Sequence, residues 1–166
     1  MHHIGYLLTE GFQVMGLATQ SVFEYANQVV GHDFYRMRNC AVAGGEITSS
    51  LGMRVDTTKA AATATIDTWV VCGVGNPLES PASQEERAFL QRAAKKARRI
   101  AGICTGGFVL AESGLLARRR ATTHWAFAAA MRARFPDIQI EDDRIYIVDG
   151  PLWTSAGMTA GLDLAL

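Results

Sequence analysis

Cysteine is scarce in this sequence, and its spacing offers no pairs. The three cysteines, Cys40, Cys72 and Cys104, are an odd number without a CxxC motif, so neither a disulfide framework nor a structural zinc site is expected. Histidines and carboxylates also fail to cluster at metal-ligand spacing, and we expect no metal and no cofactor. Unpaired thiols fit a reducing compartment, which predicts a cytoplasmic protein.

An excess of positive charge is missing as well. Sixteen basic residues balance sixteen acidic ones, so the formal net charge is zero. Proteins that bind nucleic acids on their own usually carry a basic excess. The basic runs at 95–99 and 118–120 fit a helix C-terminus and a solvated edge. Any contact with DNA is therefore expected from a different segment.

Long apolar runs are absent too. No stretch approaches the ~20 residues that span a bilayer. Residues 1–6 lack the charged and apolar regions of a signal peptide. We expect no association with a membrane.

The sequence does contain enough apolar material for one well-packed domain over residues 1–166. Hydrophobic residues make up 49% and charged residues 19% of the chain, which suits a core with two covered layers. The last residues, 163–166, are apolar and helix-like, with no glycine, proline or polar cap. We expect the sequence to be a piece of a longer protein.

Predicted strands and helices alternate along the chain. This alternation predicts an α/β fold with a mostly parallel, doubly wound sheet and helices on both faces. The strands are expected at 4–8, 34–42, 52–55 (an edge strand followed by a Thr/Ala-rich connection), 68–72, 99–103, 138–140, 144–148 and 152–155, and the helices at 14–29, 83–98, 106–111, 126–135 and 157–166.

The chemistry-bearing motif is Ile103-Cys104-Thr105-Gly106-Gly107, in which a strand delivers a thiol to a turn at the start of a helix. Helix N-terminal N–H groups can lower the pKa of such a thiol and can hold an oxyanion. Cys72-Gly73-Val74 ends another strand, and ligands bind beyond the carboxyl ends of parallel strands, so both motifs are expected in one cleft. The alternative is that Cys104 is an inert core residue.

His124 is the candidate base or charge partner of Cys104. A structural histidine that only makes a hydrogen bond is the alternative. Cys40 and Cys72 are assigned to packing, and Trp125 either offers its face to a cationic ligand or belongs to the core.

Several blocks of the sequence resemble one family. They are residues 103–116 (ICTGGFVLAESGLL), 120–125 (RATTHW) and 154–163 (TSAGMTAGLD), with weaker likeness at 7–12 and 25–27. Together they resemble the ThiJ/PfpI-like domain, of class I glutamine amidotransferase-like fold, at the N-terminus of AraC-type transcription regulators of the GlxA kind. Stand-alone isocyanide hydratases share the first two blocks.

The resemblance implies a flavodoxin-like sheet, a homodimer and a C-terminal pair of helix-turn-helix motifs that this sequence does not contain. It places Cys104 at the nucleophile elbow of the superfamily and His124 at its nearby histidine. Enzymatic members carry an acidic residue at the start of the first helix, where Gly16 stands here. Without that carboxylate, proton exchange with Cys104 lacks a partner, so Cys104 and His124 are expected to be remnants of a catalytic pair.

The leading hypothesis is therefore a ligand-sensing domain that controls DNA binding by the missing segment. A small amine, amino acid or betaine-like compound would bind in the cleft, and Gly16 is expected to leave room for it. A cysteine-dependent isocyanide hydratase or glyoxalase-type enzyme and a redox sensor that oxidises Cys104 are the alternatives. The expected ligand-binding residues are Met15, Gly16, Gly73, Val74, Cys104, Thr105, His124 and Trp125.

Overall fold

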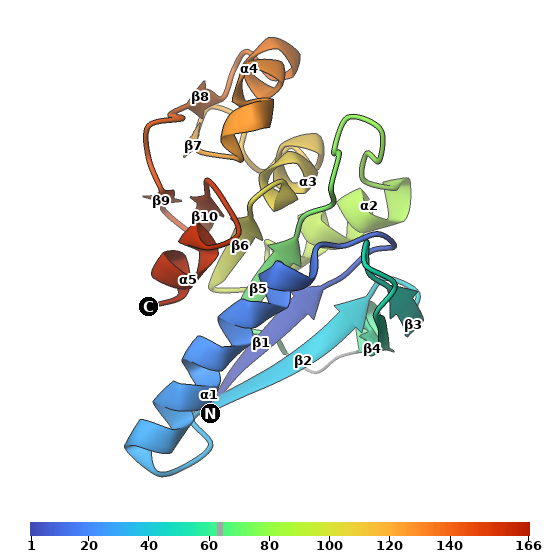
Figure 1. The fold of residues 1–166 in the computed structure, drawn as a ribbon, viewed down its shortest axis with the longest axis vertical. Coiled ribbons are helices and arrows are strands. Elements are labelled where there is room, and N and C mark those ends of the chain that lie inside the picture. Colours follow the sequence, from blue (N-terminus) through green and yellow to red (C-terminus); the bar gives the residue numbers. More distant parts are fainter. Residues whose placement is uncertain (63–64) are drawn as a thin grey trace.

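An eight-stranded sheet runs through the centre of the computed structural model, which describes residues 1–62 and 65–166 (Figure 1). The strand order is β3-β4-β2-β1-β5-β6-β10-β9. The strands are β1 (His2–Leu7), β2 (Tyr35–Ala41), β3 (Gly45–Thr48), β4 (Arg54–Lys59), β5 (Thr68–Cys72), β6 (Arg99–Ile103), β9 (Tyr146–Asp149) and β10 (Leu152–Ser155).

The six inner strands are parallel, and the two edge strands, β3 and β9, run antiparallel to their neighbours. In the centre, Leu7 of β1 pairs with Val71 of β5, and Cys72 pairs with Ile103 of β6. The carboxyl ends of β5 and β6 therefore lie side by side. This confirms the predicted α/β, flavodoxin-like class with a mostly parallel sheet.

Helices cover both faces of the sheet. On one face lie the short 3-10 helix η1 (Val14–Thr19), α1 (Gln20–Val30) and α5 (Ala160–Ala165); on the other lie α2 (Gln84–Ala93) and α3 (Gly106–Glu112). A 3-10 turn, η2 (Ala60–Ala62), follows β4. Beyond α3, α4 (Trp125–Arg134) packs with a separate two-stranded pair, β7 (Arg120–Ala121) and β8 (Gln139–Ile140).

The sheet separates two hydrophobic cores. Successive side chains of a strand point to opposite faces, so Val71 packs in the core with α2 and α3, whereas Val70 and Cys72 pack in the core with α1 and α5. Both faces of β5 are covered, and all five of its residues are buried. The predicted pair of covered layers is confirmed.

Two predicted helix boundaries were wrong for local reasons. The helix expected at 14–29 begins with a 3-10 turn and becomes α-helical only at Gln20. The helix expected at 83–98 starts with a Ser83–Glu86 capping box but ends at Ala93, because the chain turns and the N–H of Arg98 donates to the Asp67 carbonyl (2.8 Å).

The strand expected at the sheet edge, 52–55, is instead β4, which lies inside the sheet. The true edge is β3, which the sequence analysis missed. Gly44 and Gly45 have positive φ angles (74° and 87°), so the apparent turn is followed directly by a strand. Part of the Thr/Ala-rich connection after β4, residues 63–64, lies outside the described residues.

In the described part of the chain, no helix is long and apolar enough to cross a bilayer.

Candidate functional site

Cys104 stands at a sharp elbow between β6 and α3. Its φ angle is 57°, in the left-handed region that residues other than glycine seldom adopt. Such a conformation costs about 1–3 kcal/mol and persists only where the surroundings enforce it. The predicted strand–turn–helix setting of Cys104 is therefore confirmed.

Glycines allow the end of β5 to press against this elbow. A Cβ atom on Gly73 would collide with Thr105 Oγ1 and, at 2.6 Å, with the backbone nitrogen of Gly106. A Cβ atom on Gly106 would collide with the carbonyl oxygen of Val71. These contacts confirm that the Gly73-Val74 and Cys104-Thr105 segments meet at one edge of the sheet, as predicted.

Hydroxyl groups hold the backbone of the elbow. The N–H of Cys104 donates to Ser155 Oγ (3.2 Å), and Thr123 Oγ1 donates to the Cys104 carbonyl (3.2 Å). Thr105 Oγ1 donates to the Val74 carbonyl (2.6 Å) and so joins the two strand ends. Sequence reasoning did not select Ser155 or Thr123, although both lie in the blocks at 154–163 and 120–125 that carried the family resemblance.

The Cys104 thiol lies in an unfavourable setting for ionisation. Its side chain is 2% exposed, and burial raises the pKa of the thiol, while a hydrogen bond from the Thr105 backbone N–H opposes the rise. The predicted lowering of this pKa was wrong, because desolvation outweighs the N–H groups of α3, a helix of only seven residues.

Gly16 does not open a space beside Cys104. It is buried against Cys72, and a Cβ atom on Gly16 would lie 2.7 Å from the Cys72 sulfur. The room expected beside Gly16 is thus occupied by a side chain, and that expectation was wrong. Burial raises the pKa of Cys72 to about 12. Cys72 and Cys40 are both buried, as their predicted packing roles require.

His124 caps a helix. Its Nδ1 accepts a hydrogen bond from the Ala126 N–H (3.2 Å) at the start of α4, and in the described structure no hydrogen bond joins its ring to Cys104. This bond agrees with the alternative of a structural histidine, and a role of His124 as the partner of Cys104 stays a prediction. The neighbouring Trp125 is 77% exposed, so it is not a core residue, and its ring centroid lies 5.5 Å from that of His124.

A small cavity of about 50 Å³ adjoins the elbow. Val74 and Thr105 line it, and Glu10 and Glu112 bring carboxylates to its wall. Of the expected ligand-binding residues, the structure gathers Gly73, Val74, Cys104 and Thr105 at the elbow. Gly16 packs against Cys72, Met15 and Trp125 are exposed, and His124 is half-buried.

Gln13 is a polar residue beside this site that the sequence analysis missed. Its backbone N–H donates to the Gly73 carbonyl (2.9 Å), and its side-chain oxygen is buried without a hydrogen-bond partner among the described residues. A buried acceptor left unsatisfied costs about 1–3 kcal/mol. No sequence pattern marked Gln13, since its burial follows from tertiary packing.

Within the same described residues, no cluster of three or more His, Cys, Asp or Glu side chains is arranged to hold a metal ion.

The raised thiol pKa predicts that Cys104 reacts slowly in the folded protein. At pH 7.5 we expect iodoacetamide to alkylate Cys104 at least about tenfold more slowly in the native chain than in guanidinium, because only the thiolate reacts. As pH rises, the native rate should keep increasing beyond the pH at which the rate in guanidinium levels off, because the folded thiol ionises later. Peptide mass spectrometry over time measures each cysteine, with Cys72 as an internal buried control. Alkylation of native Cys104 at the unfolded rate would contradict this.

Comparison with known proteins agrees with the geometry. Two HTH-type transcriptional regulators are similar to this chain: GbdR of Pseudomonas aeruginosa, 32% identical over 98% of this chain and 44% of GbdR, and GlxA of Rhizobium meliloti, 32% identical over 99% of this chain and 51% of GlxA. The isonitrile hydratase of Pseudomonas putida is 37% identical over 72% of this chain and 52% of that enzyme. The chain spans about half the length of these curated relatives.

Solved structures share the fold. The crystal structure of an AraC family transcriptional regulator from Pseudomonas putida superposes with a TM-score of 0.84 at 21% identity, over 99% of this chain and 89% of that one. The sequence also matches the DJ-1/PfpI family over residues 12–166. The resemblance inferred from the sequence blocks is confirmed: the chain belongs to the DJ-1/PfpI family.

Proposed function

We propose that this chain is the ligand-sensing domain of an AraC-type transcriptional regulator. The observation that carries the proposal is the elbow itself: Cys104 keeps the nucleophile position, but its thiol is buried with a raised pKa. Gly16 supplies no carboxylate, and His124 Nδ1 is engaged in capping α4. Such a site favours binding over proton transfer. The similarity to GbdR and GlxA, both HTH-type transcriptional regulators, supports the same function.

The DNA-binding part of the proposed regulator lies in a segment outside this chain. The relatives are about twice as long as the matched region, and we infer a C-terminal pair of helix-turn-helix motifs in the full-length protein. The balanced charge of this chain, sixteen basic against sixteen acidic residues, agrees with DNA binding by a different segment. We also propose that the protein is cytoplasmic and does not contact a membrane.

The proposed effector is a small amine or amino-acid-like compound. Glu10 supplies a carboxylate at the cavity beside Val74 and Thr105, and a carboxylate attracts an ammonium group. The Glu112 carboxylate on the same wall is already paired with Arg134 (2.8 Å). Gln13, whose backbone N–H contacts the Gly73 carbonyl, offers a further acceptor, because its buried side-chain oxygen has no hydrogen-bond partner among the described residues. Binding would involve the strand ends and the elbow, at Gly73, Val74, Cys104 and Thr105, and would bias the regulator toward one state.

We further propose a homodimer formed through α1. None of the residues of α1 is buried, and Val22, Tyr25, Ala26 and Val29 recur at the three- and four-residue steps of one helix face. Tyr25 is 63% and Val29 is 87% exposed. An exposed apolar stripe of this kind typically marks a protein interface.

The homodimer predicts an effect of charge on the stripe. Val29→Glu should raise the dimer dissociation constant at least tenfold, about 1.4 kcal/mol, because a carboxylate would be buried without a partner. Sedimentation velocity across protein concentrations measures this. Gln28→Glu, an equal change of charge on an exposed neighbour outside the stripe, is the control. Wild-type chain that stays monomeric, or a Val29→Glu dimer as tight as wild type, contradicts the proposal.

Sensing is tested with the full-length protein. Amines and amino acids that raise the melting temperature of the domain should change the affinity of the full-length regulator for DNA upstream of its own gene by about 5- to 150-fold, the range of typical allosteric couplings. Glu10→Gln should weaken binding of the amine about tenfold, whereas Glu24→Gln, which changes an exposed carboxylate of α1 that does not line the cavity, should not. DNA affinity indifferent to every compound that binds the domain would rule out sensing.

A second candidate function is a cysteine-dependent isocyanide hydratase. The left-handed elbow of Cys104 and the similarity to the isonitrile hydratase of Pseudomonas putida favour it. Turnover of a small isocyanide by the wild-type chain, lost in Cys104→Ala, would support this function and displace the sensing proposal.

A further inference from the structure

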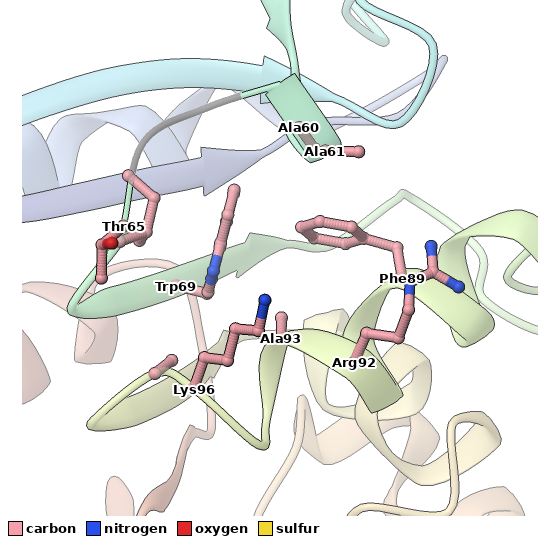
Figure 2. A pocket seen from close by; sticks show the side chains of 10 residues that line it. Ala60, Ala61, Thr65, Trp69, Phe89, Arg92, Ala93 and Lys96 are labelled. Carbon is pink, nitrogen blue, oxygen red and sulfur yellow. The ribbon is translucent and has the colours of Figure 1, made fainter.

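A second and larger cavity lies at the other end of β5, away from Cys104. It opens between the start of β5, the η2 turn and the C-terminal part of α2, and has a volume of about 280 Å³ (Figure 2). Small-molecule sites typically begin at roughly 300 Å³. The cavity is therefore large enough for a small organic molecule, whereas the space beside the elbow is about 50 Å³.

The floor of this cavity is aromatic. Trp69 and Phe89 meet edge to face, with ring centroids 4.9 Å apart and an interplanar angle of 85°. Both are nearly buried, at 4% and 6% exposure. The remaining wall is built largely of alanine, including Ala60 and Ala93, which keep the space open between the sheet and α2. Flat apolar groups pack well in such a slot.

The rim of the cavity is cationic. Arg92 and Lys96, four residues apart, reach the cavity beside Phe89 and Trp69 respectively (Figure 2). No carboxylate lines the cavity, and neither cation forms an ion pair with any carboxylate in the described part of the chain. Arg92 lies in the last turn of α2 and Lys96 in the turn that follows the helix. Two like charges held at one rim repel each other, and a bound anion would relieve that repulsion.

We propose that this cavity binds a small organic anion, a carboxylate on a flat apolar body. The body would stack against Trp69 and Phe89, and the carboxylate would bridge Arg92 and Lys96, where charge-assisted hydrogen bonds are strongest. This cavity would favour an anionic ligand, whereas the cavity beside the elbow, which carries carboxylates, would favour a cationic one. This site does not depend on the proposed sensing function, and its ligand is a different chemical class.

Calorimetric titration of the chain with phenylacetate tests the site. We expect phenylacetate to bind, and its neutral analogue phenylacetamide and inorganic phosphate each to bind at least about tenfold more weakly, since each lacks one of the two recognised parts. The double variant Arg92→Gln/Lys96→Gln should weaken phenylacetate binding at least about tenfold. Ala93→Leu, which fills the cavity and keeps its charge, should weaken it similarly.

Lys95→Gln is the matched control, because Lys95 neighbours the rim but does not line the cavity. It should leave phenylacetate affinity within about twofold of wild type. Thermal melts of every variant check the fold, and affinities are compared at a temperature where all are folded. The proposal is overturned if wild type does not bind phenylacetate, if phenylacetamide or phosphate binds as tightly, if Lys95→Gln weakens binding as much as the double variant, or if Ala93→Leu binds like wild type.

Discussion

The close approach of the end of β5 to the start of α3 is the constraint on which the candidate site depends. Gly73 and Gly106 have no side chain, so the backbone beyond β5 can press against Thr105 and Gly106, and Val71 can place its carbonyl against Gly106. This contact leaves Cys104 in the left-handed region, φ 57°, with its backbone fixed by Ser155 and Thr123. The strand ends and the elbow thereby form one rigid unit.

The same packing decides what the thiol can do. A helix N-terminus favours a thiolate, but the side chain of Cys104 is desolvated, and desolvation has the larger effect on its pKa. The position of the missing carboxylate, Gly16, is closed by the Cys72 sulfur rather than left open. The geometry of a nucleophile elbow is thus combined with a thiol whose burial raises its pKa, and this combination is the basis of the proposed binding function.

Much of the fold was predictable because its cues are local. The apolar runs at 68–72 and 99–103 and the capping residue Ser83 identify buried strands and a helix start directly. The edge strand β3 was not predictable, because its evidence lies in pairing with β4 across a glycine turn. In the candidate site, Cys104 and Thr105 were predictable because they belong to the strand–turn–helix motif at 103–107. The burial of Gln13, the capping by His124 and the cavity between Trp69 and Arg92 arise from contacts between distant segments, which periodicity does not encode.

The stability of Gly106→Ala tests the central contact most directly. Helix propensity alone predicts that alanine in α3 stabilises the chain by about 1 kcal/mol, whereas the contact with the Val71 carbonyl predicts a loss of about 3 kcal/mol in the free energy of unfolding, since backbone cannot move aside cheaply. Gly75→Ala, where a Cβ atom meets open space, is the control and should change stability by less than about 1 kcal/mol. A Gly106→Ala chain as stable as wild type in urea unfolding would contradict the account.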